Sequence, residues 1–239
     1  MATGQAAGEQ LIGISSMATR QVLAELAQLY ESQSKQRVAV ESVGGVDAAR
    51  RVQAGEPFDF VALAADVIDR LAAAGRVDPG SRIDFVRSGI AIAVAAGAPR
   101  PDVASEAAVR NAVLSARKVG YSTGPSGAYL VRLFDRWGIA DVLAPRLVQA
   151  PPGTPVGTLL ARGEVELGFQ QLSELMHLPG IDVIGPLPRE IQLMTSFPVA
   201  VCTASARPAA AMAWLSFLAS TAADAAKRRN GLEPAQAAG

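Results

Sequence analysis

The feature that most constrains the fold is the alternation of short apolar segments with amphipathic ones along most of the chain. Strands are expected at residues 11–14, 38–42, 58–65, 88–97, 119–121, 146–151, 165–171 and 197–203. Helices are expected from just after the Ser15-Ser16 pair to about residue 34, from just after Gly45 to near residue 55, and at residues 66–74, 106–115, 128–137, 153–163, 208–219 and 221–230. Such alternation favours an α/β architecture with largely parallel sheets.

Composition excludes several classes of function. The 239 residues include 22 Lys and Arg against 22 Asp and Glu, with no long basic run, so a nucleic-acid-binding role is not expected. The single cysteine, Cys202, and the single histidine, His177, cannot form a disulfide or a structural metal site, and Cys202 is expected in the core. We therefore expect no metal and no cofactor.

The longest apolar run, near residues 89–98, is much shorter than the roughly 20 residues of a membrane-spanning helix. The N-terminal stretch MATGQAAGEQ lacks the basic and apolar regions of a secretory signal. Two locations remain open at this point: the periplasm, after removal of a leader, or the cytoplasm.

Four junctions between an expected strand and an expected helix share one local design of small or hydroxylated residues. They are Ser15 with Ser16, Gly44 with Gly45, the 122–127 loop with Ser122, Ser126 and Gly127, and the 153–156 loop ending at Val156. Each junction offers free backbone N–H groups and the positive end of a helix dipole. Together they predict a site for a small anion at the carboxyl ends of the strands.

A second interpretation needs no ligand. Ser and Thr are favoured helix caps in any protein, and a Thr154-Pro155 pair satisfies ordinary rules for a helix start. The GPSGA segment, residues 124–128, fails the G-x-S-x-G pattern of a nucleophile, and VESVGG lacks the spacing of a dinucleotide-binding loop. Capping and anion binding both remain open.

Longer segments carry a family resemblance. SSMATRQVLAELAQLYES, RVQAGEPFDFVALAADVIDRLAAAGRV, PSGAYLVRLFDRWGI and LLARGEVELGFQQLSEL resemble the periplasmic molybdate-binding proteins of the type II periplasmic solute-binding superfamily. The resemblance implies two α/β lobes, residues 1–85 with 195–239 and residues 86–194, joined by two crossover strands. It also implies a ligand cleft between the lobes, with donors supplied by strand-to-helix loops.

Carried over by position, the resemblance places ligand contacts in all four loops. They fall at Ser15 or Ser16, Gly44 or Gly45, Ser126 within the Ser122–Gly127 loop, and Val156. A tyrosine that helps to hold molybdate falls at Gln171, next to Gln170. Glycines in the second loop and amides in place of the tyrosine depart from the molybdate pattern, and amides accept hydrogen bonds as well as donate them. These departures favour a small organic acid with its own hydroxyl or protonated group.

GFQQLSEL followed by PGIDVIGPLP is also similar to bacterial aconitate isomerase, built on the same scaffold. That similarity implies a 1,3-proton shift in a small polycarboxylate, for which Arg20, Asp47 and Glu174 are the nearby ionisable residues. Three hypotheses follow. The protein is a monomeric receptor that delivers an oxyanion or organic acid to an ABC transporter, an isomerase, or a ligand-sensing domain.

Overall fold

The computed structural model describes residues 10–235, which divide into two compact units. Within that range, unit 1 comprises residues 10–85, 197–229 and 234–235, and unit 2 comprises Val86–Ser196 and Asn230–Glu233. The residues before position 10, which carry most of the expectation about a leader, lie outside the described part of the chain.

The strands of unit 1 follow the order β2-β1-β3-β9. Its strands are β1 (Leu11–Ser16), β2 (Val38–Val43), β3 (Phe60–Ala62) and β9 (Met194–Val201), which begins in unit 2. Its helices are α1 (Arg20–Ser34), α2 (Gly45–Gln53), α3 (Ala65–Ala73), α9 (Pro208–Ala219) and α10 (Asp224–Arg229), with short 3₁₀ turns at Met17–Thr19, Pro79–Ser81 and Thr221–Ala223. β1 runs parallel to β2 and β3, whereas β9 is antiparallel to β3.

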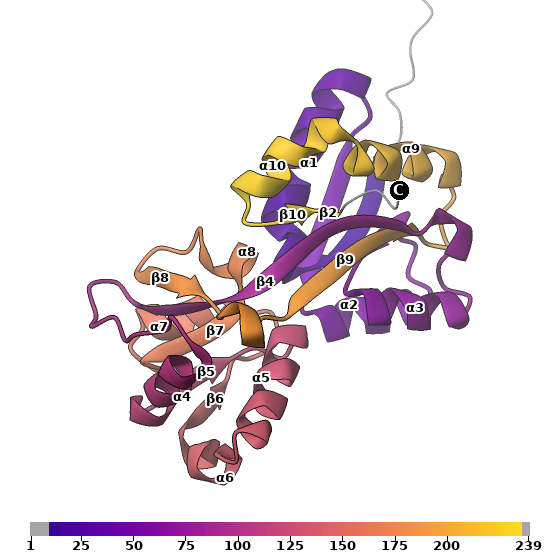
Figure 1. Cartoon of the computed structure of the whole chain (residues 1–239). Helices are drawn as coiled ribbons and strands as arrows, with labels where there is room; N and C mark the ends of the chain where they lie inside the picture. Colours follow the sequence, from indigo (N-terminus) through magenta and orange to yellow (C-terminus); the bar gives the residue numbers. More distant parts are fainter. Residues whose placement is uncertain (1–9, 236–239) are drawn as a thin grey trace, which may run out of the picture. The chain divides into compact units, whose positions relative to one another are not determined.

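Helices cover both faces of this sheet (Figure 1). On one face, Ile14 and Val61 pack with Val52 of α2 and Ile68 of α3. On the other face, the Trp214 ring of α9 lies between Tyr30 of α1, at 5.1 Å, and Phe60 of β3, at 5.9 Å. Both layers bury apolar side chains, and this burial supplies most of the stability of such a unit.

Unit 2 has the strand order β4-β7-β5-β6, and β8 also pairs with β4. Its strands are β4 (Ile83–Ala95), which begins in unit 1, β5 (Val119–Tyr121), β6 (Leu147–Gln149), β7 (Leu167–Gln171) and β8 (Ile181–Pro186). Its helices are α4 (Glu106–Ser115), α5 (Pro125–Arg136), α6 (Ala140–Leu143), α7 (Val156–Ala161) and α8 (Leu172–Leu175), with 3₁₀ turns at Ala144–Arg146 and Arg189–Ile191. β5, β6 and β7 are parallel, and β4 is antiparallel to β7 and β8. The two-residue strand β10 (Glu233–Pro234) also pairs with β4.

The side chains of β4 divide between the two faces of the unit 2 sheet. Ile90 and Ile92 lie in a cluster with residues of α4, α5 and α6, whereas Ala91 and Ala93 lie in a cluster with residues of α7 and α8. Successive residues of a strand point to opposite faces, so one strand serves both layers. Small alanines on the second face leave room for α7 close to the sheet.

The structure confirms the mixed α/β architecture and corrects several boundaries. β1 continues through Ser15 and Ser16, expected in a loop, because both residues pair with β2 in the parallel ladder. The strand expected at 58–65 is limited to Phe60–Ala62, since α3 already begins at Ala65. α5 begins at Pro125 rather than at Ala128, in agreement with the preference of proline for the first helical turn.

The structure also bears on Cys202, on metal-binding groups and on membrane-spanning helices. Cys202 is buried, as expected, and burial raises the pKa of its thiol to about 12. Across residues 10–235, no group of three or more His, Cys, Asp or Glu side chains is arranged to hold a metal ion. In the same range no single helix could span a membrane, and only the bent pair Pro208–Ala219 and Thr221–Arg229 has the length and composition when taken together.

Candidate functional site

In unit 1, the first two predicted loops lie at one edge of the sheet. β1 and β2 are parallel, and their last residues, Ser16 and Val43, are register partners. Gly44 and Gly45 follow Val43, and a Cβ atom built on Gly45 would lie 3.8 Å from the Cβ of Ser16. The structure therefore brings Ser16, Gly44 and Gly45 together.

The two adjacent serines of β1 have different roles. Ser15 is fully buried, and its Oγ lies 2.8 Å from Oγ of Ser42 in β2. Ser16 is also buried, but its Oγ has no hydrogen-bond partner among the described residues. A buried hydroxyl without a partner is costly, which makes the Ser16 hydroxyl a candidate for contact with a ligand.

The helix starts beside Ser16 are also open. No side chain caps the 3₁₀ turn that begins after Ser16, and none caps α2, which begins after Gly44. The first N–H groups of a helix have no partner within the helix, and they carry partial positive charge. This edge of unit 1 therefore offers neutral donors suited to an anion.

In unit 2, the third predicted loop follows β5. The Oγ atoms of Ser122 and Ser126 lie 3.0 Å apart, and the Gly124 N–H donates to Ser122 Oγ at 3.3 Å. α5 begins at Pro125 with no side-chain cap. Because the two hydroxyls bond to each other, one of their two protons stays available, and together with the open start of α5 it forms a second group of donors.

Gly127 holds this loop close to its helix. A Cβ atom at Gly127 would lie 1.7 Å from the carbonyl oxygen of Ser122, far inside van der Waals contact. Only glycine allows the first turn of α5 to approach the Ser122 backbone so closely. Gly127 therefore determines how close the loop after β5 lies to the first turn of α5.

The fourth predicted loop differs from the others because its donor is already used. The N–H of Val156, at the start of α7, donates to Oε1 of Gln170 at 2.7 Å. The Gln170 amide then donates through Nε2 to Glu174 Oε1 at 2.8 Å. Glycines at positions 120 and 168 allow α7 to lie directly against β5 and β7, because a Cβ atom on either would lie 2.9 Å from Val156 Cγ1.

Gln171 lies on the opposite face of β7 from Gln170, since neighbouring residues of a strand alternate. Its side-chain amide lies 2.9 Å from Thr195 Oγ1. With its oxygen accepting from Thr195, its nitrogen donates to the Ser88 carbonyl at 3.0 Å. The buried Gln171 amide thus joins β7 to β4 and β9.

Glu174, in α8 shortly after the end of β7, has a carboxyl group whose pKa is clearly shifted. Burial raises the pKa of its carboxyl from the ordinary 4.5 to about 7, and the hydrogen bond from Gln170 lowers it in part. The adjacent Ser173 has a buried Oγ without a partner among the described residues. Sequence reasoning named Glu174 only as a nearby ionisable residue and gave Ser173 no role, although both follow directly after β7.

Residues 12–233 match the model of a family described as bacterial extracellular solute-binding protein. The chain belongs to this family. A relative named aconitate isomerase, from a Pseudomonas species, is 38% identical over 230 residues, which cover 94% of this chain and 87% of that protein.

Solved structures show the same fold. The periplasmic molybdate-binding protein of Azotobacter vinelandii superposes with a TM-score of 0.80 at 19% identity, covering 95% of this chain and 100% of that one. The sulfate-binding protein of Mycobacterium tuberculosis gives 0.76 at 16% identity, covering 96% and 88%. These similarities confirm the resemblance to molybdate-binding proteins and the type II periplasmic-binding-protein fold.

Proposed function

We propose that this family member is a periplasmic receptor that binds a small organic acid and delivers it to an ABC transporter. The observation that carries the proposal is the buried, unpartnered Ser16 hydroxyl beside the uncapped start of α2. The hydrogen-bonded pair Ser122 and Ser126 supplies one further hydroxyl proton beside the uncapped start of α5. Membership of the extracellular solute-binding family supports the role as a receptor.

The choice of a carboxylate ligand over a metal oxyanion rests on the β7 end of unit 2. There the Val156 N–H is occupied by Gln170, so this helix start has one donor fewer for a fully ionised guest. Of the two polar side chains at this place, Gln170 already uses both its oxygen and its nitrogen within the protein, whereas the Glu174 carboxyl has a second oxygen that Gln170 does not contact. An accepting oxygen favours a ligand that carries a hydroxyl or a retained proton.

Calorimetry with the full chain tests this proposal. The panel contains molybdate, tungstate, sulfate, malate, citrate and trans-aconitate, and we expect one carboxylate to bind tightly. Ser16→Ala and Ser126→Ala should each weaken its binding by ~1.5–3 kcal/mol, the usual value of a hydrogen bond to a charged group, or roughly 10- to 150-fold.

The matched control is Ser32→Ala, which removes an exposed hydroxyl that bonds only within α1 and should leave affinity unchanged. Tight binding of a tetrahedral oxyanion with no binding of carboxylates would contradict the choice of ligand. Unchanged affinity in both serine variants would contradict the choice of loops.

A second candidate function is isomerisation of a small polycarboxylate. Two observations favour it: the 38% identity to a protein named aconitate isomerase, and the Glu174 carboxyl with a pKa near 7. A 1,3-proton shift needs a base whose pKa lies near the working pH. NMR of trans-aconitate with the protein in deuterated buffer should show conversion to the cis isomer with uptake of deuterium, and an unchanged spectrum would exclude the activity.

A further inference from the structure

Val46 is an apolar side chain that unit 1 leaves in solvent. It is 73% exposed, the highest value among the large hydrophobic residues that lie exposed in the described part of the chain. Single exposed valines are common on protein surfaces, so exposure alone assigns no role. The position of Val46, in the first turn of α2, is what calls for an explanation.

The packing of α2 does not use Val46. The buried face of this helix carries Ala48 and Val52, which lie in one apolar cluster with Ile14 of β1. At 3.6 residues per turn, Val46 lies roughly 200° around the helix from Ala48, on the opposite face. Valine is also a weaker helix former than alanine at an exposed position. Neither the core nor helix propensity therefore requires valine here.

Val46 lies beside the donor groups at the start of α2. Gly44 is the N-cap residue and Gly45 the first helical residue, so Val46 carries the first side chain of this helix. In a helix each Cα–Cβ bond tilts toward the N-terminus, so the Val46 methyl groups lean toward the uncapped N–H groups. Ser16, only 9% exposed and with an Oγ that lacks a partner among the described residues, lies at the same edge.

This edge of unit 1 has room for a ligand. A Cβ atom built on Gly45 would lie 3.8 Å from the Cβ of Ser16, an ordinary contact. Apart from its chain neighbours and the backbone of its own helix, it would meet no other described heavy atom within 4 Å. Glycines allow a ligand to approach the backbone closely. A ligand bound to the first N–H groups of α2 therefore lies next to the Val46 methyl groups.

We propose that Val46 is a specificity-determining residue, which contacts the hydrocarbon part of an organic acid whose carboxylate binds at Ser16 and the start of α2. This inference rests on the proposed function of a receptor for such an acid. Hydroxyl and N–H donors suit any small anion, so they do not distinguish an acid from an inorganic oxyanion. Sulfate and molybdate present only oxygen atoms, whereas the carbon atoms beside a carboxylate bury apolar surface against Val46.

Calorimetry with the full chain tests the role of Val46, with malate, citrate and trans-aconitate as acids and sulfate and molybdate as oxyanions. Val46→Ala removes apolar contact surface and should weaken binding of the acid by about 5- to 15-fold, while the Kd of an oxyanion changes less than about twofold. Val46→Thr keeps the branched shape and should weaken the acid without weakening the oxyanion. The matched control is Val142→Ala, which truncates an exposed valine of α6 and should leave every Kd unchanged.

NMR with isotope-labelled valine methyl groups locates the contact directly. The signals that are missing from Val46→Ala identify Val46, and in the wild type they should show NOEs to the carbon-bound protons of the acid. Tight binding of an acid with an unchanged Kd in Val46→Ala, or without these NOEs, would overturn the role of Val46 and leave the proposed function standing. A wild type that binds none of the acids would overturn the proposed function, and the role of Val46 with it.

Discussion

At the scale of single residues, a hydroxyl is most open to a ligand when its own neighbours leave it unused. Ser15 and Ser16 are adjacent, yet Ser15 Oγ bonds to Ser42 while Ser16 Oγ has no partner among the described residues. The sequence located this pair but left the choice between them open, since that choice depends on a strand 27 residues away. The pKa of Glu174 could not be predicted from the sequence either, because it depends on how far the fold buries the carboxyl group.

Gly127 gives a sharp test of the third loop. Gly127→Ala places a Cβ atom 1.7 Å from the Ser122 carbonyl oxygen, so the backbone must shift, and we expect a loss of ~1–3 kcal/mol or more in the free energy of unfolding. Chemical denaturation measures the loss. Gly124→Ala is the control, because its new Cβ would meet only Ser122 Oγ at an ordinary 3.7 Å. Equal stability of the two variants would show that the close approach is absent.

Glu174 also predicts how stability changes with pH. Its pKa is about 7 in the folded protein against an ordinary 4.5, so between these values the unfolded chain releases a proton that the folded protein keeps. The free energy of unfolding should therefore fall as pH rises from about 4.5 to about 7, by on the order of 2–3 kcal/mol, and level off above. In Glu174→Gln this part of the slope should disappear, and parallel denaturation profiles of the two proteins would refute the assignment.

At the scale of elements, the periodic pattern was enough to place most strands and helices. Expected segments such as 106–115, 119–121 and 208–219 match α4, β5 and α9 residue for residue. The sequence did not predict that the N–H group at the start of α7 is already hydrogen-bonded, because its partner, the Gln170 side chain, lies 14 residues further along the chain. The local sequence pattern predicts where helices and strands lie. Whether the N–H groups at a helix start are free or already hydrogen-bonded depends on residues distant in sequence.

Asp59 shows how such distant contacts hold elements together in unit 1. Its buried carboxylate accepts hydrogen bonds from the Ile12 N–H at 2.8 Å and from Ser205 Oγ at 2.7 Å, and it pairs with Arg207 at 3.1 Å. Asp59→Ala should lower the free energy of unfolding by ~3–5 kcal/mol, because it leaves buried partners unsatisfied.

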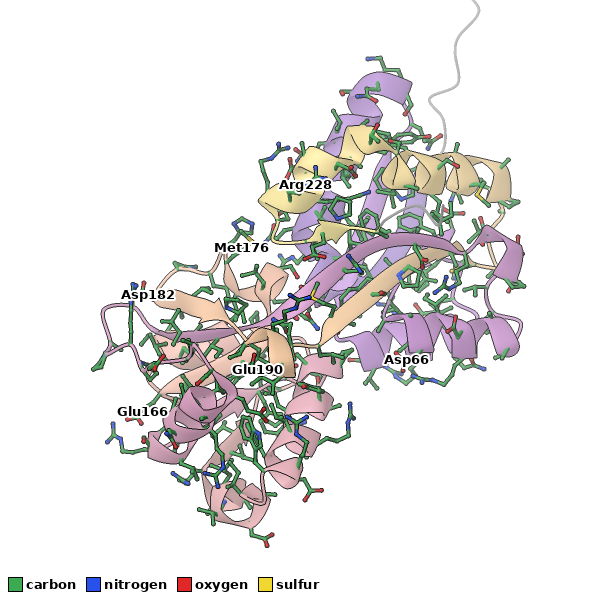
Figure 2. The ribbon with its side chains drawn as sticks, viewed as in Figure 1. Asp66, Glu166, Met176, Asp182, Glu190 and Arg228 are labelled. Carbon is green, nitrogen blue, oxygen red and sulfur yellow. The ribbon has the colours of Figure 1, made fainter. Side chains whose placement is uncertain are left out.

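The control is Asp66→Ala on α3, which removes an exposed i,i+4 pair with Arg70 and should cost less than about 1 kcal/mol (Figure 2). Denaturation of the two variants under one set of conditions provides the comparison. A cost for Asp59→Ala as small as that for Asp66→Ala would mean that the Asp59 contacts add little to stability.

At the scale of the whole molecule, the chain passes from unit 1 to unit 2 within β4 and returns within β9. The paired residues Phe60 and Val201 of β3 and β9 are therefore separated in sequence by most of unit 2. Vectorial synthesis at the ribosome must then leave the β3 edge open until the last part of the chain emerges. A nascent polypeptide of this design cannot complete its first sheet until all of β9 has been synthesised, so the β3 edge stays unpaired in the meantime.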